Sequence, residues 1–443
     1  MIWKRMRRVV DELLNKTLAP SFHPAQEKEA VRLVWNMLQS ADYKQWDGEI
    51  QRAAGSLILA MLYNIPTLQS SDDPTISRIN QFTSRFTQAI YPGMYFVEFF
   101  PWMRYFPASV SKWKRDAQMW YRRDTAFFRM LYDGVKDRMD KGDDGGCFTS
   151  HVMNRVRDQK GFELSETEIT WLSATLYGGG VDTSATLVSW CLLALLAHPE
   201  IQEKCQQELD AVVGRQRMPK FSDLEDLPYI RATAREVLRW RTPAPIGEYL
   251  SSKGEYFPPQ PFLWDFNNDS SQDDWYGGYY IPKGTLVISN IWAMNRDKEV
   301  YGIDADEFKP ERHLGSDGKL KPSPPDTKRK FSRSAIFSYP PMCDADSDRS
   351  FLDLQRELSV LATVAGRHIA NSFLLIDIAS ILWAANISPE KDAEGNVISL
   401  DISDKATVND GIVVKPLPYK CSITPRFPEV VKVVNEIKQG FEE

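Results

Sequence analysis

The chain has 443 residues, of which 43% are hydrophobic and 12% aromatic, so a large core is available and general disorder is excluded. Its formal net charge of −6 argues against a nucleic-acid-binding surface, which normally shows a basic excess. No segment reads as long and apolar enough to span a bilayer, and the charged, amphipathic start "MIWKRMRRVVDELLNK" is unlike a signal peptide.

Most of the first two-thirds of the chain is predicted to be helical. The segments "AVRLVWNMLQSA", "EIQRAAGSLILAMLYNI" and "FSDLEDLPYIRATAREVLRWR" carry apolar residues at three- and four-residue steps. In the opening segment Trp3 and Arg7 are four residues apart, on one helical face. An indole N–H beside a guanidinium can bind a carboxylate. The alternative is that the two side chains form an ordinary surface pair.

The segment "TEITWLSATLYGGGVDTSATLVSWCLLALLAHPE" reads as an apolar helix with Gly178, Gly179 and Gly180 in its middle. Each interior glycine lowers helix stability by ~1 kcal/mol relative to alanine. The run therefore indicates that a ligand or another helix must approach the backbone closely at this place. Asp182 and Thr183 follow as polar groups in a buried helix, which need partners or a wet groove with a ligand. A close helix crossing, with hydroxyls bonded back to carbonyls, is the alternative.

Two short motifs further along the chain contribute charge. In "REVLRW", Glu236 and Arg239 are three residues apart and can pair on a helix, most simply as a surface contact. In "ADEFKPERHL" a compact turn presents Arg312, whose guanidinium can fork onto a buried carboxylate. Each motif is weak evidence by itself.

Strand character appears late in the chain. "YYIPKGTLVIS" reads as a hairpin about the turn Pro282-Lys283-Gly284, and "GIVVKPLPYKCSITPRF" alternates like a short strand pair. The order of elements predicts a mainly α fold with a minor β part. Two aberrant stretches, at about 248–272 and 329–365, are polar and aperiodic.

The succession of these motifs resembles the cytochrome P-450 family of haem-thiolate monooxygenases. The phrases "TPAPIG", "GYYIPKGTLVISNIWAMNRDKEVYG" and "ILWAANI" are similar to fungal members of the methylsterigmatocystin-oxidoreductase-like type, which act in secondary metabolism. The resemblance runs from Trp3 nearly to the C-terminus. It implies the P-450 fold, incomplete at the N-terminus, as a single truncated domain over 1–443.

The resemblance also implies roles for particular residues, which are expectations at this point. Gly179 and Gly180 would leave room for dioxygen, and Asp182 and Thr183 would relay protons during its activation. Glu236, Arg239 and Arg312 would form a buried charge triad that braces the proximal side of the haem. The residues expected to bind or seat the cofactor are Trp3 and Arg7, which would hold a propionate, and Gly366, Arg367 and His368, which follow the ligand loop.

One departure from the family pattern concerns the iron ligand. The family places a cysteine two residues before the glycine matched by Gly366, and this chain has Val364 there, in "ELSVLATVAG". A thiolate is the electronic basis for O–O cleavage in such enzymes, so the metal ligand is expected to be absent. The five cysteines show no paired spacing for zinc or a disulfide framework, and the nearest upstream, Cys343, lacks glycines to shape a turn.

The codons offer an explanation for this departure. The sequence "SVLA" at 359–362 is compatible with TCG-GTT-TTG-GCC, which reads Phe-Gly-Phe-Gly when shifted by one base after a T. The sequence "GEY" at 247–249 is compatible with GGT-GAG-TAT, which contains a possible intron donor. The hypothesis is a gene-model or splice product with a retained intron and a frame slip.

Two functions are therefore weighed. The first is a haem-dependent monooxygenase that inserts one oxygen atom from O₂ into an apolar small molecule, with electrons from NADPH through a cytochrome P-450 reductase. The second is a catalytically dead P-450 scaffold. Family members are anchored at the endoplasmic reticulum membrane, and this chain shows no such anchor, so its location is left open.

Overall fold

The computed structural model describes residues 2–14, 17–39, 43–70, 73–143, 145–158, 163–251, 274–276, 278–281, 286–322, 367–392, 394–409 and 413–441, except 91–93. The Gly366 and Val364 positions, Cys343 and most of the two aberrant stretches lie outside these residues. Only 248–251 of the first stretch is described.

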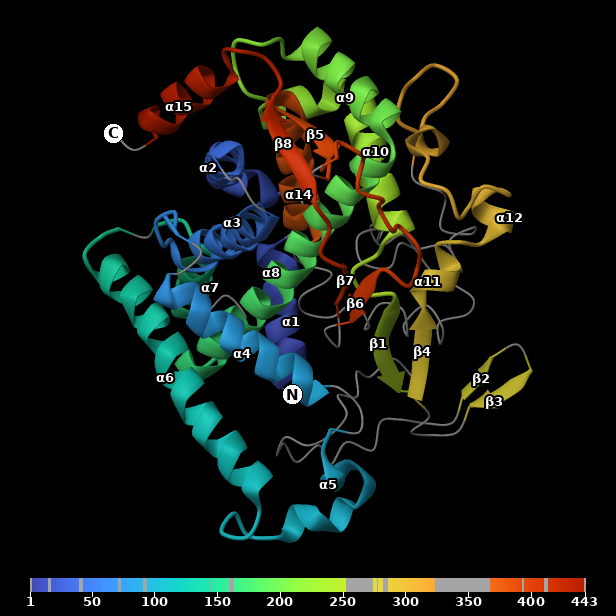
Figure 1. The fold of residues 1–443 in the computed structure, drawn as a ribbon. Coiled ribbons are helices and arrows are strands. Elements are labelled where there is room, and N and C mark those ends of the chain that lie inside the picture. The colour runs from blue at the N-terminus through green and yellow to red at the C-terminus, as the bar shows by residue number, and fades with distance from the viewer. Residues whose placement is uncertain are drawn as a thin grey trace.

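The described part of the chain is mainly helical, with a minor β part, which confirms the predicted fold class (Figure 1). The α-helices are α1 (Ile2–Leu13), α2 (His23–Gln39), α3 (Tyr43–Tyr63), α4 (Pro74–Ile90), α5 (Phe96–Phe99), α6 (Lys112–Asp140), α7 (Phe148–Arg157), α8 (Glu166–Ala197), α9 (Pro199–Val212), α10 (Pro228–Trp240), α11 (Ile291–Met294), α12 (Lys298–Tyr301), α14 (Arg367–Ala384) and α15 (Val430–Gly440). The 3₁₀ turns are η1 (Ala19–Phe22), η2 (Pro101–Tyr105), η3 (Phe221–Asp226) and η4 (Pro310–His313).

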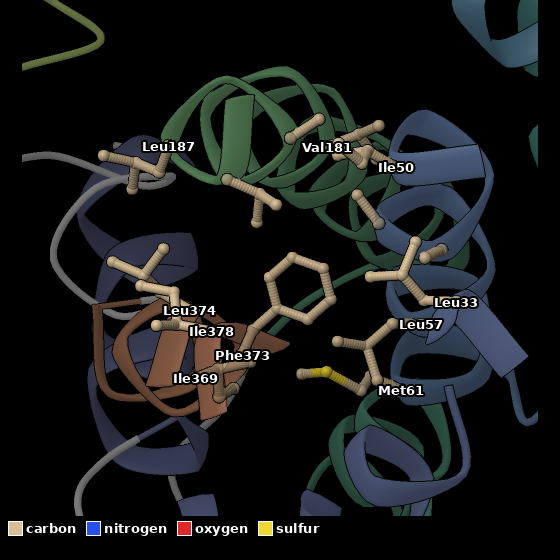
Figure 2. Packing of buried hydrophobic residues seen from close by; sticks show 14 of the residues in the cluster. Leu33, Ile50, Leu57, Met61, Val181, Leu187, Ile369, Phe373, Leu374 and Ile378 are labelled. Carbon is tan, nitrogen blue, oxygen red and sulfur yellow. The ribbon is translucent and has the colours of Figure 1, made fainter. Parts of the chain in front are cut away.

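The core lies where α2, α3, α8 and α14 pack against one another (Figure 1). Figure 2 shows Phe373 of α14 pointing into the space between the helices, toward Leu57 and Met61 of α3. Val181 of α8 and Leu33 of α2 close the same cluster. Buried hydrophobic residues from α1 to α15 belong to one continuous cluster. The single truncated domain over 1–443 stays a prediction.

The α8 helix changes one expectation from the sequence. It has 32 residues and is long and apolar enough to cross a membrane, so the statement that no segment meets that test was wrong. Within its most apolar window, however, 78% is buried inside the molecule. This burial is what the central helix of a packed core shows.

The strands are β1 (Ile246–Ser251), β2 (Asp274–Tyr276), β3 (Tyr279–Ile281), β4 (Leu286–Asn290), β5 (Ala385–Pro389), β6 (Thr407–Asn409), β7 (Val414–Pro416) and β8 (Cys421–Pro425). They form antiparallel pairs β1–β4, β2–β3, β5–β8 and β6–β7. The predicted hairpin about 282–284 was wrong, because β3 pairs with β2 and β4 pairs with β1.

The predicted strand pair near the C-terminus was wrong for the same reason. Both strands exist, but β7 pairs with β6 and β8 pairs with β5. Alternating residues show that a segment is extended, and they do not show which strand lies beside it. The pairing in this chain is decided by where the helices place each strand.

Candidate functional site

The helix α8 carries the residues predicted to lie beside dioxygen. A capping box fixes its start: Ser165 Oγ accepts a hydrogen bond from the Glu168 backbone N–H at 3.2 Å, and the Glu168 carboxylate accepts one from the Ser165 N–H at 2.6 Å. Asp182 and Thr183, four turns further on, are partly exposed, whereas Val181 and Ser184 on either side are buried. The polar pair therefore lies at an accessible place on a mostly buried helix.

The glycine run brings α8 close to α3. A Cβ atom added at Gly180 would lie 3.1 Å from Cδ1 of Ile58, which is tighter than ordinary contact. At Gly178 the nearest atoms, in Phe82 and Thr83, would be 3.7 Å away. For Gly180 the structure thus gives the close helix crossing that the sequence left as the alternative, and the predicted roles of Gly179 and Gly180 beside dioxygen stay predictions.

The polar pair has partners of its own. Thr183 donates its hydroxyl hydrogen to the Gly179 carbonyl at 2.8 Å, a back-bond that leaves the oxygen lone pairs available. Asp182 Oδ1 lies 3.8 Å from Nζ of Lys415 in β7. Burial raises the pKa of Asp47 on α3, and Lys415 opposes that rise, so this lysine acts on carboxylates of two helices. Lys415 was missed because nothing local relates it to Asp182.

A second cluster surrounds Glu236 of α10, which is fully buried. Its Oε2 accepts from Arg239 Nε at 2.8 Å, and its Oε1 accepts from Arg239 Nη2 at 2.7 Å and from Arg312 Nε at 2.9 Å. The backbone N–H of Lys309 adds a bond of 2.9 Å to Oε1. The structure brings the three predicted members together, as a buried group rather than the surface contact that is the usual case.

The two arginines of this cluster also hold the backbone around them. Arg239 donates to the carbonyls of Asn295 at 2.8 Å and Ala305 at 2.6 Å. Arg312 donates to the carbonyls of Tyr301 and Asp304, each at 2.7 Å. The cluster therefore joins α10 to the segment from α11 to η4, which is structural work.

His313 is a fourth member that sequence reasoning missed. Its Nε2 lies 2.9 Å from Glu236 Oε2. Burial lowers the pKa of His313 even though Glu236 opposes the change, so the ring is neutral at pH 7 and its N–H donates. Burial alone would raise the pKa of Glu236, but bonds from Arg239 and His313 outweigh it and hold that pKa at about 2. The signal available in the sequence was its place directly after Arg312.

The predicted cofactor contacts are placed only in part. Trp3 and Arg7 lie in α1, which packs against α7 and α8, and Arg367 and His368 open α14. The side chains of Trp3, Arg7 and Arg367 are outside the description, and His368 is partly buried. The propionate and seating roles of these residues stay predictions.

The ligand set for a haem-thiolate centre does not fit this chain. The side chain of Val364 has no lone pair in any conformation, so the family position supplies no donor. Among the described cysteines, burial raises the pKa of Cys205 and of Cys421 to about 12, which keeps both as neutral thiols. The described residues also contain no group of three or more His, Cys, Asp or Glu side chains able to hold a metal ion. Neither Val364 nor the described cysteines therefore supply the thiolate that the family uses, and Cys343 lies outside the described residues.

Comparison with known proteins identifies the frame to which these residues belong. The sequence model of the cytochrome P-450 family matches residues 2–250 and 267–330, and leaves out 251–266 and everything after 330. A cytochrome P-450 monooxygenase of Armillaria gallica is 41% identical over 438 residues, which cover 99% of this chain and 75% of that protein.

Other relatives agree. Cytochrome P-450 monooxygenase 58 of Postia placenta is 36% identical over 439 residues, covering 99% of this chain and 74% of its own length. Cytochrome P-450 monooxygenase iboC of Amanita muscaria is 34% identical over 462 residues, which cover 99% of this chain and 77% of that protein. The chain therefore belongs to the cytochrome P-450 family of monooxygenases, a haem family.

Proposed function

We propose that the gene from which this chain derives encodes a haem-dependent monooxygenase. It inserts one oxygen atom from O₂ into an apolar small molecule and receives electrons from NADPH through a cytochrome P-450 reductase. The observation that supports this proposal is the pair Asp182 and Thr183, which stays accessible on a mostly buried apolar helix. A hydroxyl and a carboxylate at such a place are suited to hold and move protons.

The remaining predicted residues take binding and bracing roles in this proposal. Trp3 and Arg7 bind a propionate, and Gly366, Arg367 and His368 seat the start of α14. The cluster of Glu236, Arg239 and Arg312 braces the proximal side through its bonds to the backbone between α11 and η4. None of these roles requires the cysteine that the family has at the position of Val364.

A second candidate, a scaffold without catalytic activity, is favoured by one specific observation. Position 364 holds valine, and the described cysteines are free thiols elsewhere in the fold, three of them buried and Cys421 partly buried. The family match omits 251–266 and ends at 330, which supports the hypothesis that a retained intron and a frame slip produced the two aberrant stretches. In this reading the chain as written is a splice or gene-model product.

Sequencing cDNA across the codons for 246–275 and 330–366 separates the two candidates. We expect the transcript to lack the aberrant stretches and to encode a Phe-Gly-x-Gly loop with a cysteine. The protein from that transcript then gives a thiolate-type band in its reduced carbon-monoxide spectrum, and the chain as written gives none. A transcript identical to this sequence would reject the splice hypothesis, and a thiolate band from the chain as written would reject the inactive scaffold.

We also propose that the protein works at a membrane surface. The support is an aromatic surface made by α5, η2 and the residues beside them, which projects from the body of the molecule (Figure 1). Its strongly exposed members are Phe96, Phe99, Trp102 and Tyr105. Lys114 of the adjoining helix α6 donates from Nζ to the Phe106 carbonyl at 2.7 Å, so a cationic group lies next to this surface. Exposed aromatic side chains with neighbouring lysines suit the boundary of an anionic bilayer.

A further inference from the structure

Arg241, directly after α10, is a buried cation that the proposed mechanism does not use. Its side chain lies within cation–π range of three indole rings, with its Cζ 4.3 Å from the ring centroid of Trp240, 5.1 Å from that of Trp292 and 5.3 Å from that of Trp190. The residue is 3% exposed. Because these tryptophans come from α8, α10 and α11, one guanidinium joins three elements.

The hydrogen bonds of Arg241 go to a different part of the chain. Nη1 donates to Asp404 Oδ1 at 2.7 Å, and Nη2 donates to the Ile402 carbonyl at 2.6 Å. These acceptors lie just before β6, so the planar fork of Arg241 holds the approach to the hairpin formed by β6 and β7. A lysine at this position would keep the charge and lose the two-pronged grip.

The segment after Arg241 holds the other strand of the same hairpin. The Pro243 carbonyl accepts from the Val414 N–H at 2.7 Å, and the Val414 carbonyl accepts from Trp190 Nε1 at 3.0 Å. The backbone of Val414 is therefore fixed on both sides by the neighbourhood of Arg241. The next residue, Lys415, is the one that lies 3.8 Å from Asp182.

These contacts form one path from Arg241 to the polar pair of α8. We propose that Arg241 is a positioning residue. Its guanidinium, held among Trp190, Trp240 and Trp292, fixes the β6–β7 hairpin beside Asp182. The hairpin thereby shapes the surface that an apolar substrate contacts beside α8. The positioning of the hairpin is a property of the chain itself. Its consequence for substrate rests on the proposed monooxygenase function.

Hydrogen exchange in the full chain tests the positioning. In Arg241→Met, which keeps an unbranched side chain without charge, we expect the amides of Val414 and Trp292 to exchange at least about tenfold faster. These amides donate to the carbonyls of Pro243 and Pro245, which lie two and four residues after Arg241. The amides of β5 and β8, which pair elsewhere, keep their rates. Arg241→Lys gives a smaller increase, because the cation stays among the rings and the fork is lost.

The matched control is Arg231→Met in α10, the helix that Arg241 follows; the Arg231 guanidinium donates to the exposed Glu225. It should leave the exchange of both reporter amides unchanged. If Arg241→Met does not fold, Asp404→Asn takes its place, since it weakens one prong of the fork at a largely exposed acceptor. Unchanged rates at Val414 in Arg241→Lys and Asp404→Asn, or an equal increase at β5 and β8, would overturn the proposal.

A second measurement tests the effect of Arg241 on the substrate. In the protein from a transcript that encodes the ligand cysteine, Arg241→Lys should change the ratio of products formed from one apolar substrate, with the carbon-monoxide band unchanged in amount. An unchanged ratio together with faster exchange would reject the consequence for substrate. A missing band in every variant would instead count against the monooxygenase function, so the two failures are distinguishable.

Discussion

At the scale of single residues, Asp377 of α14 has a carboxyl group whose charged form is costly to bury. It is fully buried, and neither carboxylate oxygen has a hydrogen-bond partner among the described residues. Burial raises the pKa of Asp377, the nearby Glu29 adds to the rise, and Arg52 opposes it. A carboxyl group in this position is kept protonated in the folded state beyond its ordinary range.

Replacing this carboxyl group by an amide should therefore stabilise the protein. We expect Asp377→Asn to raise the free energy of unfolding at pH 7 by about 1–3 kcal/mol. Unfolding lets the aspartate lose a proton, which favours the unfolded chain by about 1.4 kcal/mol per pH unit above the unfolded pKa, and the amide has no such proton to lose. The folded-state pKa is above the unfolded one, so the aspartate loses stability as pH rises, and the gain should vanish below about pH 4. Urea unfolding at both pH values measures this; a less stable Asp377→Asn at pH 7 would show that the carboxylate is paired.

Glu236 predicts the opposite dependence on pH. Its folded-state pKa of about 2 is below the ordinary value, so its contribution is present at neutral pH and is lost as pH falls toward 2. Glu236→Gln should lower the free energy of unfolding at pH 7 by about 3–5 kcal/mol, because two buried guanidinium groups lose their counter-charge. Glu225→Gln, in an exposed pair with Arg231, should change it by less than about 1 kcal/mol. Equal losses in the two variants would contradict the structure.

At the scale of elements, the glycines of α8 give a paired prediction. Gly178→Ala should stabilise the helix by up to about 1 kcal/mol, since the new Cβ meets only ordinary contacts at 3.7 Å. Gly180→Ala should show no such gain, because its Cβ would press on Ile58 at 3.1 Å. Adding Ile58→Val, which removes that Cδ1 atom, should restore part of the gain. Thermal unfolding of these three variants, and of Ile58→Val alone as the reference, checks this, and equal gains for the two alanines would reject the close crossing.

The elements also show what the sequence was able to predict. Helices such as α2, α3 and α10 were found because their apolar period is a local property, and the pairing of Glu236 with Arg239 follows from a three-residue step on one helix. Strand partners were missed because β5 and β8 are brought together by the folded helices, not by neighbouring residues. Lys415 beside Asp182 was missed for the same reason.

At the scale of the whole molecule, the aromatic surface around α5 and η2 predicts binding to lipid. Replacing Phe96, Trp102 and Tyr105 together by serine should weaken sedimentation with anionic phosphatidylcholine–phosphatidylserine vesicles by about tenfold or more, since each ring loses apolar burial. These side chains are exposed, so the fold should be retained. Ile303→Ser, at an isolated site that is 90% exposed, is the control. Equal sedimentation of the triple variant and the unchanged chain would reject a lipid-binding surface.

The buried cluster around Glu236 has a consequence for how this chain tolerates inserted sequence. Its members Glu236 and Arg312 are 76 residues apart, and the first aberrant stretch, about 248–272, lies between them. Loop-closure entropy grows only with the logarithm of loop length, so roughly 25 extra residues add about 0.4 kcal/mol to the cost of joining the two partners. The buried ion pairs resist loss far more strongly than that. Under the splice hypothesis, retained intron sequence at this place would be nearly neutral for the scaffold, so the chain would keep the architecture of its family even where a change in reading frame had removed the iron ligand.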